Sequence, residues 1–356
     1  VAMAPITKHK LRVLVVAGHD DEFWGTEYKG VKEADMTLEL GKELRKFLST
    51  NASFEVIMAR DDGGYHPILK RYFEENEEAI LASVKNKKEI MQDLVEAGKV
   101  ALADGVFHNE ASSSVVIRLY GINKWANEND IDLVVHVHFN DYPRRKQGAP
   151  GKYSGFSIYV PERQYSNARA SKEVALSVSK QLKTYYQESN MPKESTGVVE
   201  DQDLIAIGSF NSLDSASILI EYGYIYEPQF LNAEIRSKVI SDMAAQTYFG
   251  IHNFFSSTKS TLEGKYSTAF LPHTWKESIS AGAQYHPSIL SLQAALTLEG
   301  VYPPKERDPH ECPIAGIYGA CTKKSVALFQ QKYNISGESE RLGEKTMRKL
   351  NELYSE

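Results

Sequence analysis

The sequence predicts an α/β fold, in which helices flank a mostly parallel sheet, followed by a small all-α domain of three helices. Apolar, β-branched runs such as residues 13–16 are typical of strands that are buried on both faces. The segments between these runs carry apolar residues at three- and four-residue spacing, which indicates helices that connect the strands by right-handed crossovers. After residue 285 this alternation stops, and three short helical stretches separated by Gly-containing turns predict the second domain.

Composition narrows the class of protein. The chain has 356 residues, enough for one large domain and a small second one. Its 42% hydrophobic and 25% charged residues are typical of a soluble globular protein, and its net charge of −6 argues against a nucleic-acid partner. No apolar run approaches the ~20 residues that a membrane-spanning helix needs. The first ten residues lack the apolar core of a signal peptide, so we expect either a cytoplasmic chain or a processed one.

The expected elements alternate along residues 1–258, which form the first domain. We expect strands at 13–16, 54–59, 131–137, 156–160 and 215–225. We expect helices at 33–48, 67–103, 114–130, 164–187 and 233–255. The polar, Gly-containing segment 259–284 is typical of a linker, and residues 285–356 form the second domain.

Polar side chains follow the predicted strands at one edge of the sheet. His19 leaves the first strand, Glu33 starts the next helix, and His136 and His138 lie two apart at the end of a later strand. Ligand sites in open α/β sheets lie at this carboxyl edge, and catalytic zinc takes three His, Asp or Glu ligands. A zinc site is therefore one interpretation. The other is that each histidine is an ordinary hydrogen-bonded residue at a strand end.

Four motifs in this order, VVAGHD, KEADMTLELG, HVHFND and ILIEYGYIYEPQ, resemble the zinc-dependent N-acetylmuramoyl-L-alanine amidases that have a parallel-sheet catalytic domain. The resemblance spans about residues 11–255. It implies one zinc ion held by His19, Glu33 and His138, with Glu221 as the catalytic carboxylate. The implied reaction is hydrolysis of the amide between the lactyl group of N-acetylmuramic acid and the first L-alanine of the stem peptide in peptidoglycan.

The sequence departs from the family pattern at three places. The loop DDEFWGTEYKG is bulkier and more acidic than usual, so it offers rival ligands: Asp20, Asp21, Glu22 and Glu27. A small residue normally stands at the position of His136, which is either a rival ligand or a partner of one. A helical insertion at about 66–105 either covers the site as a lid or packs on the flank of the sheet. Further candidates to contact a ligand or the substrate follow His138: Asn140, Arg144 and Arg145.

Residues 285–354 contain the elements LQAAL, GIYGACTKKSVALFQ and LGEKT, which resemble the three-helix peptidoglycan-binding module found beside cell-wall hydrolases. The expected core of this module is apolar: Leu292, Leu296, Val326, Phe329, Met347 and Leu350. Cys312 and Cys321 are the two cysteines of the chain, and a domain this small gains from a cross-link, so we favour a disulfide over free thiols. An oxidised pair predicts an extracytoplasmic protein, whether secreted, periplasmic or associated with the cell wall.

Both resemblances point to the same polymer, and the prediction is a peptidoglycan amidase with a wall-binding module. Two alternatives stay open at this point. One is a zinc carboxypeptidase or endopeptidase that cleaves a different amide of the wall peptides. The other is a catalytically inactive wall-binding regulator, in which the acidic loop or the insertion has disabled the metal site.

Overall fold

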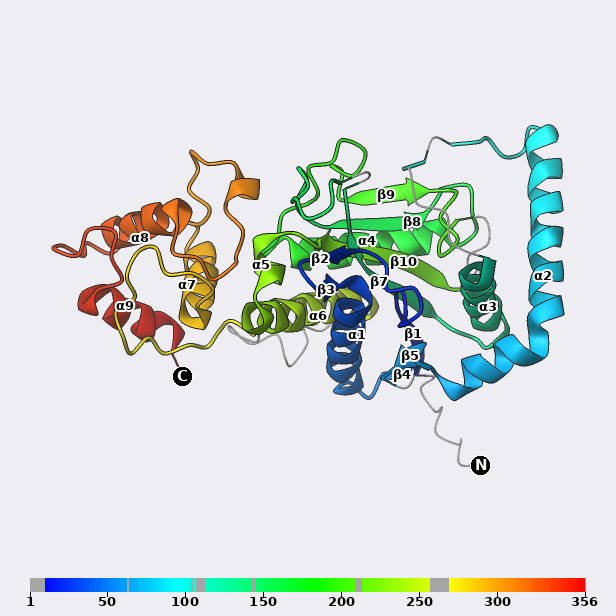
Figure 1. The fold of residues 1–356 in the computed structure, drawn as a ribbon, viewed down its shortest axis with the longest axis horizontal. Coiled ribbons are helices and arrows are strands. Elements are labelled where there is room, and N and C mark those ends of the chain that lie inside the picture. The colour runs from blue at the N-terminus through cyan, green and yellow to red at the C-terminus, as the bar shows by residue number, and fades with distance from the viewer. Residues whose placement is uncertain are drawn as a thin grey trace, which may run out of the picture.

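A computed structural model describes residues 10–62, 64–103, 105–106, 113–142, 145–208, 213–256 and 269–355. Its centre is a six-stranded sheet in the order β4-β1-β7-β10-β8-β9 (Figure 1). Within this sheet, every pair of neighbouring strands is parallel except β8 with β10. The strands are β1 Leu11–Ala17, β4 Phe54–Met58, β7 Leu133–Asn140, β8 Ser157–Pro161, β9 Val198–Asp201 and β10 Ala216–Tyr224. The predicted fold class is therefore confirmed.

Helices cover both faces of this sheet. Alternate residues of β1 point to opposite faces, so Val13 and Val15 join one apolar cluster while Leu14 and Val16 join another. The first cluster is covered by α1 Glu33–Ser49, α4 Ala168–Leu182 and α6 Ala233–Phe255. The second is covered by α3 Ser113–Glu128 and the start of α2 Pro67–Glu96. This burial on both faces explains why the strand is a continuous apolar run.

Shorter elements complete the described part of the first domain. They are the hairpin strands β2 Glu27–Tyr28 and β3 Val31–Lys32, the pair β5 Arg60–Asp61 and β6 Gly64–Tyr65, and the single turn α5 Pro228–Leu231. The sequence did not indicate these elements or β9, because two to four residues are too few for a period to be recognised. The helix expected at 164–187 is shorter than predicted, since a turn over residues 162–165 precedes it and Leu182 ends it.

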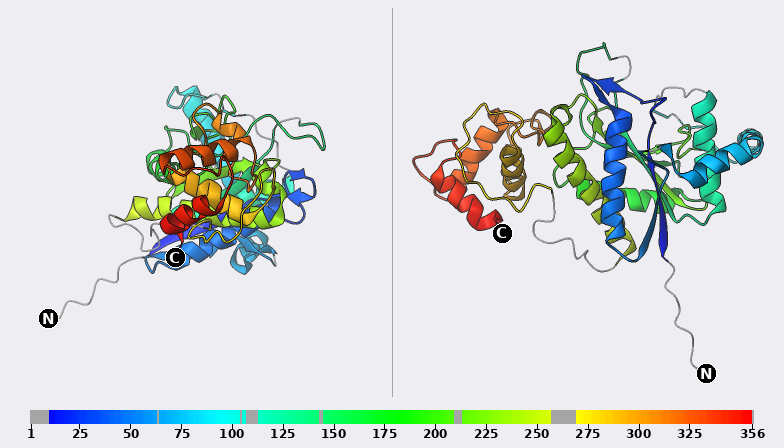
Figure 2. Two further views of the ribbon diagram at one scale, coloured as in Figure 1. Left: turned by 90° about the vertical axis from the view of Figure 1, so that its left-hand side faces the viewer. Right: turned by 60° about the horizontal axis from the view of Figure 1, so that its bottom comes forward.

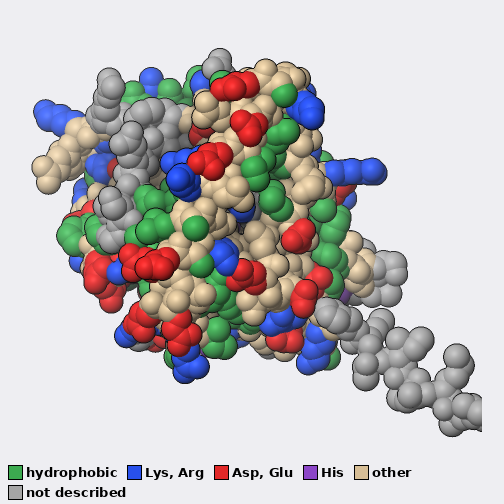
Figure 3. All heavy atoms as spheres, turned by 90° about the vertical axis from the view of Figure 1, so that its right-hand side faces the viewer, with side chains coloured by type: hydrophobic (Ala, Val, Ile, Leu, Met, Phe, Trp, Pro, Cys, Tyr) green, Lys and Arg blue, Asp and Glu red, His purple; other side chains and the backbone are tan. Residues whose placement is uncertain are grey.

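The insertion forms α2, which packs along α3 at the edge of the molecule (Figure 1). The helical geometry of α2 is interrupted at Asn76, whose amide donates to the carbonyl of Tyr72. On the face that carries α2, Lys and Arg side chains are interspersed with Asp and Glu (Figure 3). This position corresponds to packing on the flank of the sheet, the second of the two interpretations offered by the sequence.

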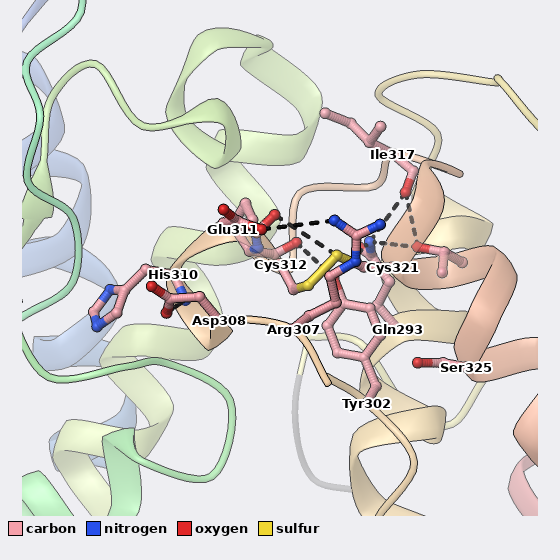
Figure 4. The surroundings of a disulfide bond; sticks show 12 residues. Gln293, Tyr302, Arg307, Asp308, His310, Glu311, Cys312, Ile317, Cys321 and Ser325 are labelled. Atoms are coloured by element: carbon pink, nitrogen blue, oxygen red, sulfur yellow. Dashed lines mark hydrogen bonds and ion pairs between the residues drawn. A yellow bond between two sulfur atoms is a disulfide. The ribbon is translucent and has the colours of Figure 1, made fainter. Parts of the chain in front are cut away.

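Residues after 285 form the three expected helices, α7 Pro287–Leu298, α8 Ala320–Lys332 and α9 Glu344–Tyr354, with the 3₁₀ turn Pro309–Glu311 between the first two. They lie at one end of the molecule, opposite α2 and α3 (Figures 1 and 2). The expected core residues are buried except Met347, which is partly buried. Cys312 and Cys321 form a disulfide that joins the end of the 3₁₀ turn to the first turn of α8 (Figure 4).

The segment expected to be a linker is packed where the structure describes it. Residues 257–268 lie outside the described part of the chain, but Phe270 and Trp275 are both buried. The ring of Phe270 lies against Tyr185, with 5.5 Å between ring centroids, and Ser154 Oγ is 2.9 Å from His310 Nδ1. A continuous apolar cluster therefore joins the C-terminal helices to the first domain. Among the described residues, no helix is both long enough and apolar enough to cross a bilayer.

The buried carboxyl group of Asp242 is expected to make the stability of the folded protein depend on pH. Asp242 is fully buried in α6, where Tyr186 and Gln246 donate to its carboxyl group, and burial raises its pKa from 3.8 to about 7. Because the raised pKa belongs to the folded state, the folded protein binds the extra proton and stability falls as the pH rises from about 4 to 7. We expect Asp242→Asn to increase the free energy of unfolding on the order of 3 kcal/mol at pH 8 and to have little effect at pH 4. Urea unfolding at the two pH values measures this, and a variant that is less stable at pH 8 would contradict it.

Candidate active site

Three side chains from distant parts of the chain meet at the carboxyl edge of the sheet. β1 ends at Ala17, and His19 follows with a positive φ of 62°. Glu33 is the first residue of α1, and His138 lies on β7 beside β1. His19 Nε2 is 3.1 Å from Glu33 Oε2, and His138 Nδ1 is 3.1 Å from Glu33 Oε1. One ligand atom from each of the three residues lies within 4.8 Å of the others, a spacing that could hold a metal ion.

Backbone contacts fix the position of the Glu33 carboxylate. The amide of Thr26 donates to Oε2 at 3.0 Å, and the amide of Phe139 donates to Oε1 at 3.2 Å. The ring of His138 lies against Gly18, where a Cβ atom would be 2.3 Å from its Cε1. Glycine at this position is therefore required for the ring to occupy its place.

The charges of the three groups depend on one another. Burial by itself raises the pKa of Glu33, but its charge interactions and hydrogen bonds with His19 and His138 outweigh burial and lower that pKa. Burial lowers the pKa of His138 below its usual value, whereas at His19 the effect of Glu33 outweighs burial and raises the pKa. A carboxylate and two imidazoles are the donor set of catalytic zinc sites, and the His19 side chain is 31% exposed, so one side is open to solvent.

Glu221 lies beside this group. It stands in the middle of β10, directly opposite His138 in the parallel pairing with β7. Glu221 is half-buried, and its Oε2 atom is buried without a hydrogen-bond partner among the described residues. Burial, followed by the charges of Glu33 and Glu194, raises its pKa well above the usual value of 4.5. The side chain is therefore suited to accept and hold a proton near the three possible ligands.

The rival acids of the loop after His19 do not belong to the group that could hold a metal, which consists of His19, Glu33 and His138. Asp20 Oδ1 accepts hydrogen bonds from the amides of Glu22 and Phe23, and its Oδ2 is 2.8 Å from Arg118 of α3. Glu22 also pairs with Arg118. The remaining two acids, Asp21 and Glu27, are exposed. Of these four acids, Asp20 and Glu22 thus tie the loop to itself and to α3.

The two candidates on β7 are both placed close to the site. His136 is buried, and burial lowers its pKa to about 3, so the ring is neutral. Its Nε2 atom has no hydrogen-bond partner among the described residues. Asn140 donates from Nδ2 to Glu194 at 2.9 Å and lies at the end of the strand.

Arg145 is held by the loop that follows β7. Its guanidinium makes a bidentate pair with Asp141 and also donates to the carbonyl oxygens of Ala149 and Glu27. The side chain is only 8% exposed. These contacts fix the position of Arg145 in the loop, and its contact with a substrate stays a prediction; Arg144 lies outside the described residues.

Sequence reasoning missed two buried charged residues near the site. Arg60 is 3% exposed and donates to the carbonyl oxygens of Ala17, Gly18 and Ala34, which ties the end of β1 to the start of α1. Arg60 directly follows the strand predicted at 54–59. Its expected place at the carboxyl edge of the sheet was therefore the only signal in the sequence that it lies near the site. Its partners are three backbone carbonyls and the hydroxyl of Thr37, and no local pattern in the sequence marks these groups as its partners.

Glu194 is the second of these residues and is completely buried. Its Oε1 accepts hydrogen bonds from Asn140 and Tyr159, at 2.9 and 2.5 Å. Its Oε2 accepts from Ser189 and Tyr224, at 2.6 and 2.9 Å. Four donors around one carboxylate compensate for its burial and join β7, β8 and β10 around Glu221.

Gly18 offers a direct test of the geometry. We expect Gly18→Ala to displace the ring of His138 and to weaken Zn²⁺ binding about 10- to 100-fold, the usual cost of disturbing the support of a ligand. Competition with a chromophoric chelator measures the affinity. Gly319→Ala is the matched control, because the nearest atom to a Cβ there is Ile317 Cγ2, at 3.7 Å. Equal zinc affinity in the two variants, with both folded, would show that His138 does not bind the metal.

Comparison with known proteins identifies the family. A family model described as N-acetylmuramoyl-L-alanine amidase matches residues 13–253. No curated protein matches the chain in a sequence search.

Solved structures of low sequence identity also match. An N-acetylmuramoyl-L-alanine amidase from Clostridium difficile 630 has 18% identity and a TM-score of 0.43, over 70% of this chain and 98% of that one. An amidase of the same name from Nostoc punctiforme has 18% identity and a TM-score of 0.41, also over 70% and 98%. One from Mycobacterium smegmatis has 16% identity and a TM-score of 0.44, over 70% and 99%. Since the family model covers more than half of the sequence, the chain belongs to the N-acetylmuramoyl-L-alanine amidase family, whose members cleave peptidoglycan.

Proposed function

We propose that this amidase uses one zinc ion, held by His19, Glu33 and His138, with Glu221 as its general base and acid. The observation that carries the proposal is the convergence of three ligand atoms within 4.8 Å at the carboxyl edge of the sheet. Two imidazoles and one carboxylate fit zinc and leave a fourth position for water. When bound, zinc lowers the pKa of a coordinated water to about 7 and polarises the carbonyl of the substrate.

The protein supplies the remaining chemistry. Glu221 Oε2 accepts the proton of the attacking water and holds it, because burial favours the protonated form of this side chain. The same atom then delivers the proton to the nitrogen of the departing L-alanine, which allows the stem peptide to leave as an amine. Glu33 stays in place during these transfers, since backbone amides of Thr26 and Phe139 bind its carboxylate.

The proposal extends to the location and to the C-terminal helices. The disulfide between Cys312 and Cys321 supports a protein that works in an oxidising compartment outside the cytoplasm. The three helices α7, α8 and α9 form in the expected order and bury five of the six expected core residues, which supports the assignment of peptidoglycan binding to them. Their packing against the first domain keeps such a module at a set distance from the active site.

Two variants separate the metal ligands from the base. We expect Glu221→Gln to keep zinc and lose about 10²- to 10⁴-fold in turnover, because it cannot accept the proton. His19→Ala loses both zinc and activity. Zinc content by elemental analysis and release of stem peptide from purified peptidoglycan measure the two properties.

Mass spectrometry of the same digest identifies the bond that is cleaved. Intact stem peptide with a free L-alanine amine is the expected product, whereas loss of a terminal residue would indicate a carboxypeptidase. A wild-type protein without zinc and without products would indicate an inactive binder. Full turnover in the Glu221 variant would remove this residue from the mechanism.

The C-terminal module gives a separate prediction. We expect the full chain carrying Glu221→Gln to sediment with insoluble peptidoglycan, and the same chain ending at Ser256 to sediment at least several-fold less. The shortened chain is first checked for zinc content and a cooperative unfolding transition, because α6 packs against α7. Equal sedimentation of two folded chains would place wall binding in the first domain alone.

A further inference from the structure

We propose that Phe23 and Trp24 form an aromatic platform at the rim of the active site, on which the sugar ring next to the cleaved bond stacks. This inference rests on the proposed function, because it names the part of the substrate that the loop after His19 recognises. The two residues belong to the bulky loop that departs from the family pattern, and no role in the catalytic chemistry accounts for them.

Both side chains are exposed, and Trp24 is far more exposed than the other tryptophans. Phe23 is 36% and Trp24 is 42% exposed, whereas the other two tryptophans of the chain, Trp125 and Trp275, are 4% and 2% exposed. Leaving two adjacent aromatic rings in water forgoes the free energy that their burial contributes to folding. Adjacent exposed aromatic side chains beside a catalytic group are therefore typical of a binding surface.

Hydrogen bonds fix the backbone that carries these rings. Asp20 accepts from the amide of Phe23, and its own amide donates to the Phe23 carbonyl. Arg118 of α3 anchors Asp20 by an ion pair at 2.8 Å. The Trp24 carbonyl accepts from the amide of Ala34 in α1. A loop whose backbone is already ordered loses less conformational entropy on binding.

The platform is adjacent to the metal-binding group. Gly25 follows Trp24 directly, and a Cβ atom at Gly25 would lie 2.3 Å from Glu33 Oε2 and 2.7 Å from His19 Cδ2. The backbone next to Trp24 therefore touches two of the three proposed ligands. The ammonium of Lys32 lies over the Trp24 ring, 4.7 Å from its centroid, so one face of the indole is covered by this protein's own side chain. The exposed area remains for a ligand.

The chemistry of the substrate selects a sugar as the occupant. In the amide that this family cleaves, the carbonyl carbon is separated from the muramic acid ring by one carbon and one ether oxygen. A carbonyl carbon at the metal therefore brings the sugar ring to the rim. The C–H bonds on the face of a pyranose are apolar and pack against aromatic faces, and a neutral sugar tolerates the ammonium of Lys32 nearby.

Two soluble substrates test the platform. One is an N-acetylmuramoyl peptide, and the other is the lactyl peptide of the same sequence without the sugar ring. We expect Trp24→Ala to raise KM about tenfold on the first with kcat unchanged, and to leave the second unaffected, since one aromatic anchor contributes about this much to binding. Phe23→Ala changes KM in the same direction. Phe254→Ala is the control, because Phe254 is 38% exposed and its neighbour Phe255 packs on Phe54 at the opposite edge of the sheet.

Equal losses on both substrates would show that the loop contacts the peptide or only shapes the site, and no loss on either would show that Trp24 binds nothing there. Both outcomes overturn the platform. Failure of the wild type on both substrates would contradict the proposed function instead.

Fluorescence then tests the platform independently of catalysis. Trp24 is the exposed tryptophan, so peptide-free glycan strands added to the metal-free protein are expected to change the emission of the wild type and not that of Trp24→Phe. A wild-type emission that does not respond would refute the platform.

Discussion

The carboxylate of Glu33, shared between two imidazoles, is the interaction on which the site depends. Each oxygen of this carboxylate lies 3.1 Å from one histidine nitrogen and accepts a hydrogen bond from one backbone amide. Both oxygens therefore have partners within the protein. This arrangement compensates for the burial of the charge and ties the end of β1, the start of α1 and β7 to one point.

Buried ionic groups surround this point on two sides. Arg60 draws the carbonyl oxygens at the end of β1 and the start of α1 together, and Glu194 collects donors from three strands around Glu221. Both groups are buried, and neither belongs to the group of described residues that could hold a metal. Their polar bonds instead limit how the ends of the strands can move, which supports a preorganised site.

The acidic loop after His19 differs from the family pattern, and its contacts show what its extra side chains do in the fold. Two of its acids, Asp20 and Glu22, build and anchor the loop, and the group that could hold a metal consists of His19, Glu33 and His138. The same bonds present Phe23 and Trp24 to solvent beside Glu33. Membership of the amidase family, together with an intact group of possible ligands, favours an active amidase over the carboxypeptidase and the inactive regulator.

Local patterns in the sequence determined the strand before His19, the helix that begins at Glu33 and the three C-terminal helices, since apolar periodicity reports burial directly. The strand-end pattern pointed to His136 and His138 together, whereas the choice of His138 and the role of Glu221 came from the resemblance, because residues 119 and 202 positions after His19 carry no local sign that they meet it. Tertiary structure alone decided the roles of Arg60 and Glu194 and the packing of Phe270 on Tyr185. Their partners are backbone atoms or side chains from remote segments, and only the folded chain brings such groups within bonding distance.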